Sequence, residues 1–220
     1  MTEWSIIWDA RGAFLNGALN TLILFILSVL AAFAMGCVAV YLLEARNALS
    51  TTLRWAINLM RMLPFLVLAY LLYYGLPALG FKPSAWSAGL VALATYHAAY
   101  FAEILRGARI VLPAGQIEAA KAHGFRSARL FWRIILPQLV IRTRPLLGNQ
   151  LIYALKDTAF LTIITVQELT AAANSVQATY FIPTEAFVVV IALYWVICIC
   201  LELALKWAGR LGAKRGFEHA

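Results

Sequence analysis

Lys156 and Asp157 are adjacent charges in an otherwise apolar stretch, and the hydroxyl of Thr158 follows them. Neighbouring charges of opposite sign suit a solute that carries both a carboxylate and an ammonium group, such as an amino acid. In this hypothesis Asp157 binds the ammonium, Lys156 binds the carboxylate or a carboxylate of a gate, and Thr158 donates a hydrogen bond. Adjacent helical residues point about 100° apart, so in the alternative Lys156 snorkels outward and Asp157 caps a broken helix.

His97 and Glu103 are two further ionisable residues within an apolar run. Both could line a solute pathway, and with Asp157 they could relay protons in a stand-alone channel or a proton-coupled carrier. Structural roles are the stronger alternative for each. Glu103 precedes Arg106 by three residues, a spacing that pairs side chains on one helix face. For His97 we expect a hydrogen bond to a neighbouring helix.

The sequence lacks the motifs of several enzyme classes. It has no Gly-rich loop ending in Gly-Lys-Ser/Thr, so we expect ATP and its magnesium ion to be bound by another subunit and no cofactor in this chain. It also lacks the zinc and serine hydrolase motifs of an intramembrane enzyme. Cys37, Cys198 and Cys200 lie in apolar runs without metal-ligand spacing, so no metal site is expected.

The composition calls for lipid as a solvent. Of 220 residues, 63% are hydrophobic and 13% charged, well above the roughly half-apolar content of soluble domains. Only helices or closed barrels satisfy their backbone groups in hydrocarbon, and long apolar runs favour helices. The net charge of +8 does not indicate nucleic-acid binding, because the basic residues fall between the hydrophobic runs. We therefore predict an all-α membrane protein with one membrane domain over residues 1–220.

Five segments are apolar and long enough to cross a bilayer, which takes roughly 20 helical residues. They are Gly17–Leu43, Ala56–Leu76, Trp86–Leu105, Pro145–Val166 and Ala186–Leu205. The fourth is the weakest, because Lys156 and Asp157 interrupt it. An odd number of passes places the two termini on opposite sides of the membrane.

Positive charge is distributed unevenly between the two sides, and basic loops face the cytoplasm. The basic residues of one side follow the first, third and fifth passes: Arg46, Arg54, Arg106, Arg109, Lys121, Arg126, Arg129, Arg133, Arg142, Arg144, Arg210, Lys214 and Arg215. The other side carries only Arg11 and Lys82. We predict an external N-terminus and a cytoplasmic C-terminus.

The cytoplasmic segment between the third and fourth passes, about residues 111–137, has too regular a pattern for a slack loop. Pro113 and Gly115 suit the entry of a helix, and Gly124 can adopt the positive φ that ends one. Beyond Gly124 the apolar residues recur at helical spacing while three arginines occupy another face: Leu130, Phe131, Ile134 and Ile135 against Arg126, Arg129 and Arg133. The pattern predicts two short helices around Gly124 that form a docking element.

This segment resembles the EAA loop of bacterial ABC importer permeases. Glu118-Ala119-Ala120 is followed after three residues by Gly124 and, after nine more, by Ile134-x-Leu136-Pro137. In that family the loop is a coupling helix seated on the cytoplasmic ATPase. The resemblance implies that Glu118, Ala119, Ala120 and Gly124 transmit ATP-driven closure. An ordinary amphipathic surface helix is the alternative.

Further matches are similar to the polar amino acid uptake group of these permeases. They are Gly17-x-x-x-Thr21-Leu22, Arg61-Met62-Leu63-Pro64, Ala99-Tyr100-x-Ala102-Glu103-x-x-Arg106-Gly107 and Lys156-Asp157-Thr158. Met62 and Leu63 stand where the group usually has small or polar residues, and Ala159-Phe160 stands where it has a Ser-Leu pair; both departures lie where solute would pass. The resemblance covers almost the whole chain.

The resemblance implies an inner-membrane permease subunit that imports polar amino acids or similar solutes, with no enzymatic activity of its own. Its expected partners are a cytoplasmic ABC ATPase dimer, a second identical or similar permease, a periplasmic or extracellular solute-binding protein and membrane lipid. Gly36 suits a helix–helix interface with the second permease. A stand-alone carrier using His97, Glu103 and Asp157 leaves the EAA loop unexplained. An intramembrane enzyme has no nucleophile or metal cluster to support it.

Overall fold

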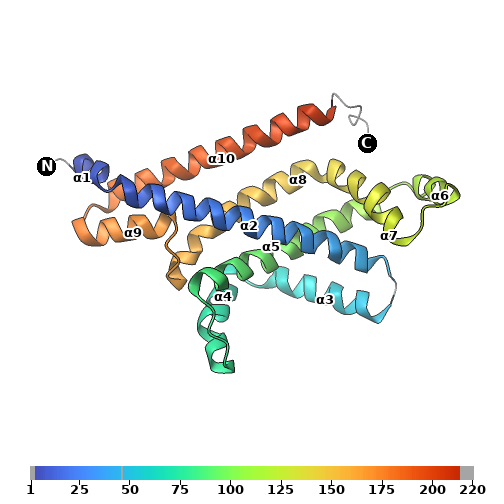
Figure 1. Cartoon of the computed structure of the whole chain (residues 1–220), viewed down its shortest axis with the longest axis horizontal. Coiled ribbons are helices and arrows are strands. Elements are labelled where there is room, and N and C mark those ends of the chain that lie inside the picture. The colour runs from blue at the N-terminus through green and yellow to red at the C-terminus, as the bar shows by residue number, and fades with distance from the viewer. Residues whose placement is uncertain (1–2, 46, 214–220) are drawn as a thin grey trace. The chain divides into compact units, whose positions relative to one another are not determined.

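Three long helices are the main elements of the computed structural model (Figure 1). The structure describes residues 3–45 and 47–213, and within these ranges it contains helices and no strand. The long helices are α2 (Arg11–Leu43), α5 (Ala85–Ile110) and α10 (Pro183–Ala213). Each contains a stretch long and apolar enough to cross a membrane, as predicted for the first, third and fifth passes.

The second predicted pass is a broken helix. Within the predicted pass Ala56–Leu76, α3 (Ala48–Met62) ends before Pro64, and α4 (Phe65–Tyr70) begins after it. Proline lacks an N–H group and disfavours helical backbone in the residue before it, here Leu63. The chain then runs through the π-helical turn η1 (Leu71–Gly75) and the 3-10 turn η2 (Leu76–Leu79).

The fourth predicted pass changes helix type within its length. α8 (Leu136–Asp157) continues as the 3-10 helix η4 (Thr158–Ile164), which ends at Thr165 with φ of 66°. A short helix that the hydropathy did not reveal, α9 (Leu169–Tyr180), follows. Both broken stretches are apolar and long enough to cross a membrane only when each pair of helices is taken together.

The chain packs as two compact units, and α2, α5, α8 and α10 contribute residues to both. The first unit contains the described residues up to Leu30, with Leu63–Ala94 and Ile152–Leu203. The second contains Ala31–Met62, Thr95–Leu151 and the described residues from Ala204 onward. Arg46, Lys214 and Arg215, on which the predicted orientation partly rests, lie outside the described residues, as does the side chain of Arg210.

The core of the first unit joins α1 (Glu3–Asp9) and the start of α2 to α9 and the start of α10 (Figure 1). Its buried residues include Ile7, Phe14, Leu169, Ala173, Val176 and Ala186. A Cβ atom at Gly17 would lie 3.0 Å from the carbonyl oxygen of Glu168. The glycine therefore lets α2 approach the backbone at the start of α9.

The core of the second unit gathers the end of α2, α3 and α5 with the segment around Phe131. Its buried residues include Val40, Ile57, Leu105, Ala120, Leu130, Phe131 and Leu139. Gly36 lies within this unit, where an added Cβ would meet the Cβ of Phe101 at 2.9 Å. The expectation that Gly36 serves an interface with a second permease was wrong, because its own α5 occupies that space.

Candidate functional site

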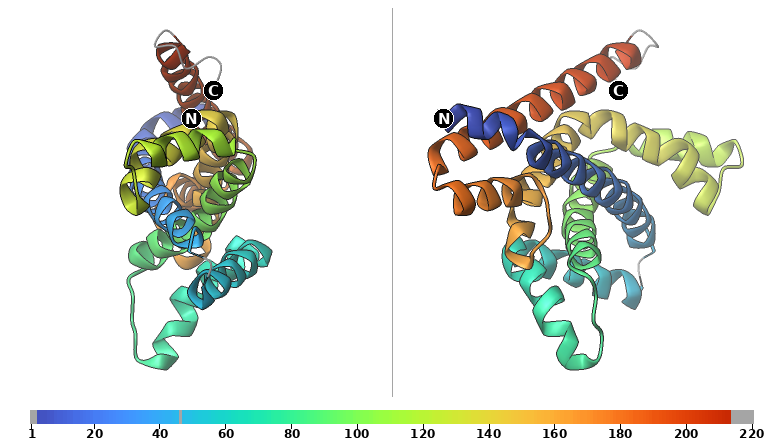
Figure 2. Two further views of the ribbon diagram at one scale, coloured as in Figure 1. Left: turned by 90° about the vertical axis from the view of Figure 1, so that its right-hand side faces the viewer. Right: turned by 60° about the vertical axis from the view of Figure 1, so that its left-hand side comes forward.

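The predicted docking element is a helical hairpin (Figure 2). α6 (Ala114–Ala122) begins after Pro113, and its end is closed by two backbone hydrogen bonds, Gly124 N–H to Lys121 O at 2.9 Å and Phe125 N–H to Ala120 O at 3.1 Å. Gly124 has φ of +83°, as predicted. This pair of bonds with a left-handed glycine is the Schellman ending of a helix, so the turn has a defined geometry.

The second helix of the hairpin, α7 (Ser127–Leu130), is continuous with the elements that follow it. It continues through the π-helical turn η3 (Phe131–Ile135) into α8. Leu130, Phe131 and Ile135 are buried and Ile134 is half-buried, whereas Arg126, Arg129 and Arg133 are exposed. The predicted separation of an apolar face from an arginine face is confirmed.

The four residues of the EAA motif do not share one environment. Glu118, Ala119 and Gly124 are exposed on the hairpin. Ala120 is buried and packs into the core of the second unit. Glu118 and Ala119 are thus available to a partner surface, while Ala120 ties α6 to the body of its own unit.

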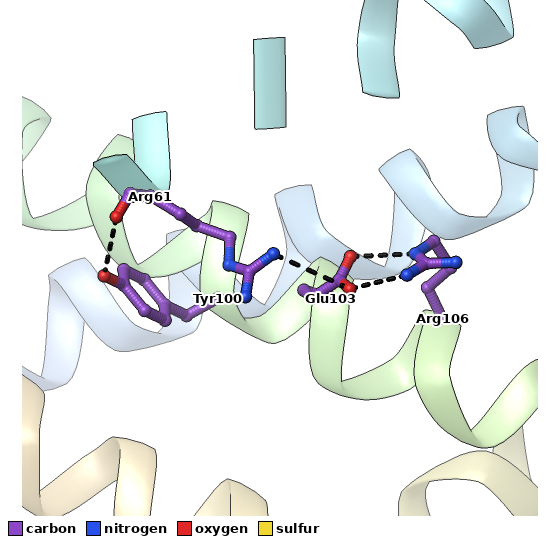
Figure 3. Close-up of polar contacts among 4 residues, drawn as sticks. All are labelled: Arg61, Tyr100, Glu103 and Arg106. Atoms are coloured by element: carbon purple, nitrogen blue, oxygen red, sulfur yellow. Dashed lines mark hydrogen bonds and ion pairs between the residues drawn. The ribbon is translucent and has the colours of Figure 1, made fainter. Parts of the chain in front are cut away.

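Glu103 forms the predicted ion pair with Arg106 and meets an additional arginine from α3 (Figure 3). Arg106 donates from Nε to Oε2 at 2.8 Å and from Nη2 to Oε1 at 2.6 Å. Nη1 of Arg61 lies 3.6 Å from Oε1. The hydroxyl of Tyr100 donates to the backbone carbonyl of Arg61 at 3.2 Å. The second unit therefore places a charged cluster at the end of α3.

His97 forms the hydrogen bond to a neighbouring helix that its structural interpretation predicts. Its side chain is buried in α5, and Nδ1 lies 2.8 Å from Nε2 of Gln150 in α8. Since the amide nitrogen of Gln150 is a donor only, Nδ1 of His97 accepts this bond. The partner could not be identified from sequence spacing, because Gln150 is 53 residues away.

Lys156, Asp157 and Thr158 face different surroundings in the first unit. Lys156 is exposed, Asp157 is half-buried at the junction of α8 and η4, and Thr158 is fully buried. The side chain of Asp157 makes no capping hydrogen bond to η4. The hydroxyl of Thr158 donates to the carbonyl of Leu155 at 2.6 Å. Thr158 thus stabilises the junction, and Lys156 and Asp157 are the two members of the motif with side chains accessible to solutes.

The sequence did not reveal a buried polar network around Glu168. This carboxylate is fully buried and accepts the backbone N–H groups of Thr170 at 2.8 Å and Ala171 at 2.7 Å, so it caps α9. Tyr194 of α10 donates its hydroxyl to Glu168 at 3.2 Å and lies 3.2 Å from the hydroxyl of Thr158. Glu is not among the residues preferred at an N-cap, so the residue type of Glu168 did not indicate the cap.

Comparison with known proteins shows which protein family the chain belongs to. Residues 25–211 match the family described as binding-protein-dependent transport system inner membrane component. The chain belongs to this family. Members of this permease family with assigned substrates resemble it over most of its length.

Two curated relatives and one solved structure illustrate the likeness. The probable glutamine ABC transporter permease protein GlnM of Bacillus subtilis (strain 168) is 28% identical over 92% of this chain and 94% of its own. The octopine transport system permease protein OccM of Rhizobium radiobacter is 33% identical over 93% and 89%. A chain of a crystallised amino acid ABC transporter is 28% identical, with a TM-score of 0.85 over 96% of this chain and 99% of that one.

Proposed function

We propose that this chain is the membrane-spanning permease subunit of an ABC importer that moves polar amino acids, or solutes built from them, into the cytoplasm. The observation that carries the proposal is the family match over residues 25–211. Relatives aligned over nearly their whole length are permeases named for glutamine and octopine transport. A subunit of this kind provides the route across the membrane, while ATP hydrolysis takes place in a partner.

We infer a single permease domain with five membrane passes, an external N-terminus and a cytoplasmic C-terminus. Three continuous helices and two broken ones supply five candidate passes. With this orientation, the exposed Arg126, Arg129 and Arg133 face the cytoplasm. The complex would reside in the inner membrane and contain an ABC ATPase dimer, a second permease and an external solute-binding protein.

The hairpin of α6 and α7 has the properties required of a coupling element. Exposed Glu118 and Ala119 offer a polar, sterically open face to the ATPase, while buried Ala120 and half-buried Phe125 pack into the core of the second unit. Because protein cores are close-packed, a displacement of α6 is transmitted to the residues around it. Gly124 fixes the direction in which the chain leaves α6.

Substrate would be contacted by ionisable side chains of the pathway. Asp157 and Lys156 carry the opposite charges that complement a zwitterion, and both are accessible within their unit. The carboxylate of Glu103 is already paired with Arg106, so its role is to position the neighbouring arginines and not to contact the substrate. His97, buried and bonded to Gln150, acts in packing between α5 and α8.

Affinity purification of the tagged chain in mild detergent, followed by mass spectrometry, tests the assembly. We expect an ABC ATPase and a second permease, identical or similar, to be recovered with it, and ATPase activity in the purified complex. Recovery of the chain alone, with no ATPase subunit under several detergents, would support a stand-alone carrier instead.

A further inference from the structure

Arg61 and Arg106 share the single carboxylate of Glu103, and they share it unequally (Figure 3). Arg106 binds both carboxylate oxygens, at 2.8 and 2.6 Å. Arg61 comes no closer than 3.6 Å, which is beyond hydrogen-bonding distance. Two guanidinium groups and one carboxylate leave one positive charge in the cluster, and it resides on Arg61.

Tyr100 holds Arg61 from the opposite side. The Cζ atom of Arg61 lies 5.7 Å from the centroid of the Tyr100 ring, within cation–π range. The Tyr100 hydroxyl also binds the backbone carbonyl of Arg61, one of the carbonyls left open at the end of α3. Arg61 is therefore oriented before any ligand arrives, which lowers the entropic cost of binding.

The guanidinium of Arg61 retains donors that the protein does not use. Among the described residues, none accepts a hydrogen bond from its Nε atom, although that atom is buried. The side chain as a whole is 34% exposed. A buried donor without an acceptor is unfavourable, and a planar guanidinium matches a carboxylate through two parallel bonds. Because Nε is buried while the side chain is partly exposed, an anion of carboxylate geometry would bind the exposed terminal nitrogens of the guanidinium.

Two other polar residues accompany Arg61 on its face of α3. Arg61 shares one face of α3 with Arg54 and Asn58, which lie seven and three residues before it. Arg54 and Asn58 line a hollow of about 710 Å³ together with Asn47, Ala48, Ser50, Thr51 and Trp55. Arg54 thus carries the same charge as Arg61 on the same face of α3, but lines a hollow of which Arg61 is not part.

We propose that Arg61 is a carboxylate-binding residue of the translocation pathway. It receives the α-carboxylate of the amino acid in transit, and Glu103 and Tyr100 act as positioning residues that hold its guanidinium. The inference rests on the proposed function and adds a specificity determinant to it: the solute must carry a free carboxylate. Other residues would distinguish between the side chains of different amino acid solutes.

The test is equilibrium binding of radiolabelled L-glutamine and L-arginine to the complete permease–ATPase complex in nanodiscs. We expect Arg61→Gln to weaken binding of the imported amino acid by roughly tenfold to a hundredfold, as for the loss of hydrogen bonds to a charged group. Arg61→Lys should recover part of the loss. The α-amides, L-glutaminamide and L-argininamide, should bind weakly and equally to the wild type and to Arg61→Gln.

Arg54→Gln is the matched control, because it removes the same charge from the same face of α3. We expect its effect to stay below about threefold. An equal loss in Arg54→Gln, or an equal loss for the α-amides, would overturn the proposal by indicating a general effect of charge. Unchanged binding in Arg61→Gln would also overturn it.

The lipid composition and a parallel uptake assay separate the other outcomes. The loss in Arg61→Gln should be the same in phosphatidylcholine discs and in discs containing phosphatidylglycerol. A loss seen only with phosphatidylglycerol would make a lipid phosphate the occupant and overturn the proposal. ATP-driven uptake of either amino acid without measurable binding to the wild type would overturn the Arg61 site alone, whereas failure of all amino acid uptake would overturn the proposed function as well.

Discussion

The backbone N–H of Phe125 donates a 3.1 Å hydrogen bond to the carbonyl of Ala120, across the turn that ends α6. Ala120 is buried in the core of the second unit, and Phe125 packs against the same core. Glu118 and Ala119, which directly precede Ala120, are exposed. The hairpin therefore joins a surface available to a partner directly to the interior of its unit.

Gly124→Ala tests the importance of this turn. A non-glycine residue in the left-handed region costs roughly 1–2 kcal/mol, so the φ of +83° at Gly124 would be strained. We expect weaker transport per ATP hydrolysed, measured in proteoliposomes that contain the complete importer. Gly115→Ala is the control, since an added Cβ there meets nothing within 4 Å. Equal coupling ratios in the two variants would contradict a coupling role for the turn.

Gln150→Leu distinguishes a structural from a proton-carrying His97. The variant removes the 2.8 Å bond between Gln150 and His97, and a lost hydrogen bond destabilises a protein by about 0.5–1.5 kcal/mol. We expect a lower midpoint of thermal unfolding for the purified complex and an unaltered pH profile of uptake. A shifted pH profile would support the proton-relay alternative.

Tyr194→Phe examines the buried network of the first unit. It removes the hydroxyl that donates to Glu168 at 3.2 Å and leaves the carboxylate with its two backbone donors. A loss of about 0.5–1.5 kcal/mol in unfolding free energy is expected, measured by chemical unfolding in detergent. Tyr180→Phe, at an exposed tyrosine, should be neutral. Equal stabilities of the two variants would mean that the network contributes nothing.

Asp157→Asn tests the zwitterion hypothesis. The variant keeps the shape of the side chain and removes its charge, so a substrate ammonium loses its partner. The KM of uptake should rise roughly tenfold or more, since hydrogen bonds to charged groups contribute about 1.5–3 kcal/mol. Wild-type kinetics in Asp157→Asn would exclude this role.

Local sequence patterns predicted the parts of the structure that local interactions determine. The apolar lengths of α2, α5 and α10 identified three passes, and the spacing of Glu103 and Arg106 predicted their ion pair. The turn at Gly124 was predicted because glycine can adopt the positive φ that ends a helix. Pro64 breaks the helix of the second pass. Because the residues on both sides of it are apolar, hydropathy alone indicated one pass and did not reveal the break.

Contacts between distant segments could not be predicted in this way. Arg61 reaches the Glu103 cluster from another helix, and Tyr194 reaches Glu168 across 26 residues of sequence. α9 contains small and polar residues, so its hydropathy does not resemble that of a membrane pass. A single sequence shows which residues are able to form such contacts. Which of them meet depends on how the helices pack, and one sequence does not show that.

Uptake of labelled amino acids into proteoliposomes is the most direct test of the permease assignment. The vesicles would contain this chain, its copurifying permease and ATPase, and the solute-binding protein. We predict accumulation of at least one polar amino acid that requires both ATP and the ATPase subunit. Accumulation that proceeds at the same rate without ATP, or with this chain alone, would contradict the assignment.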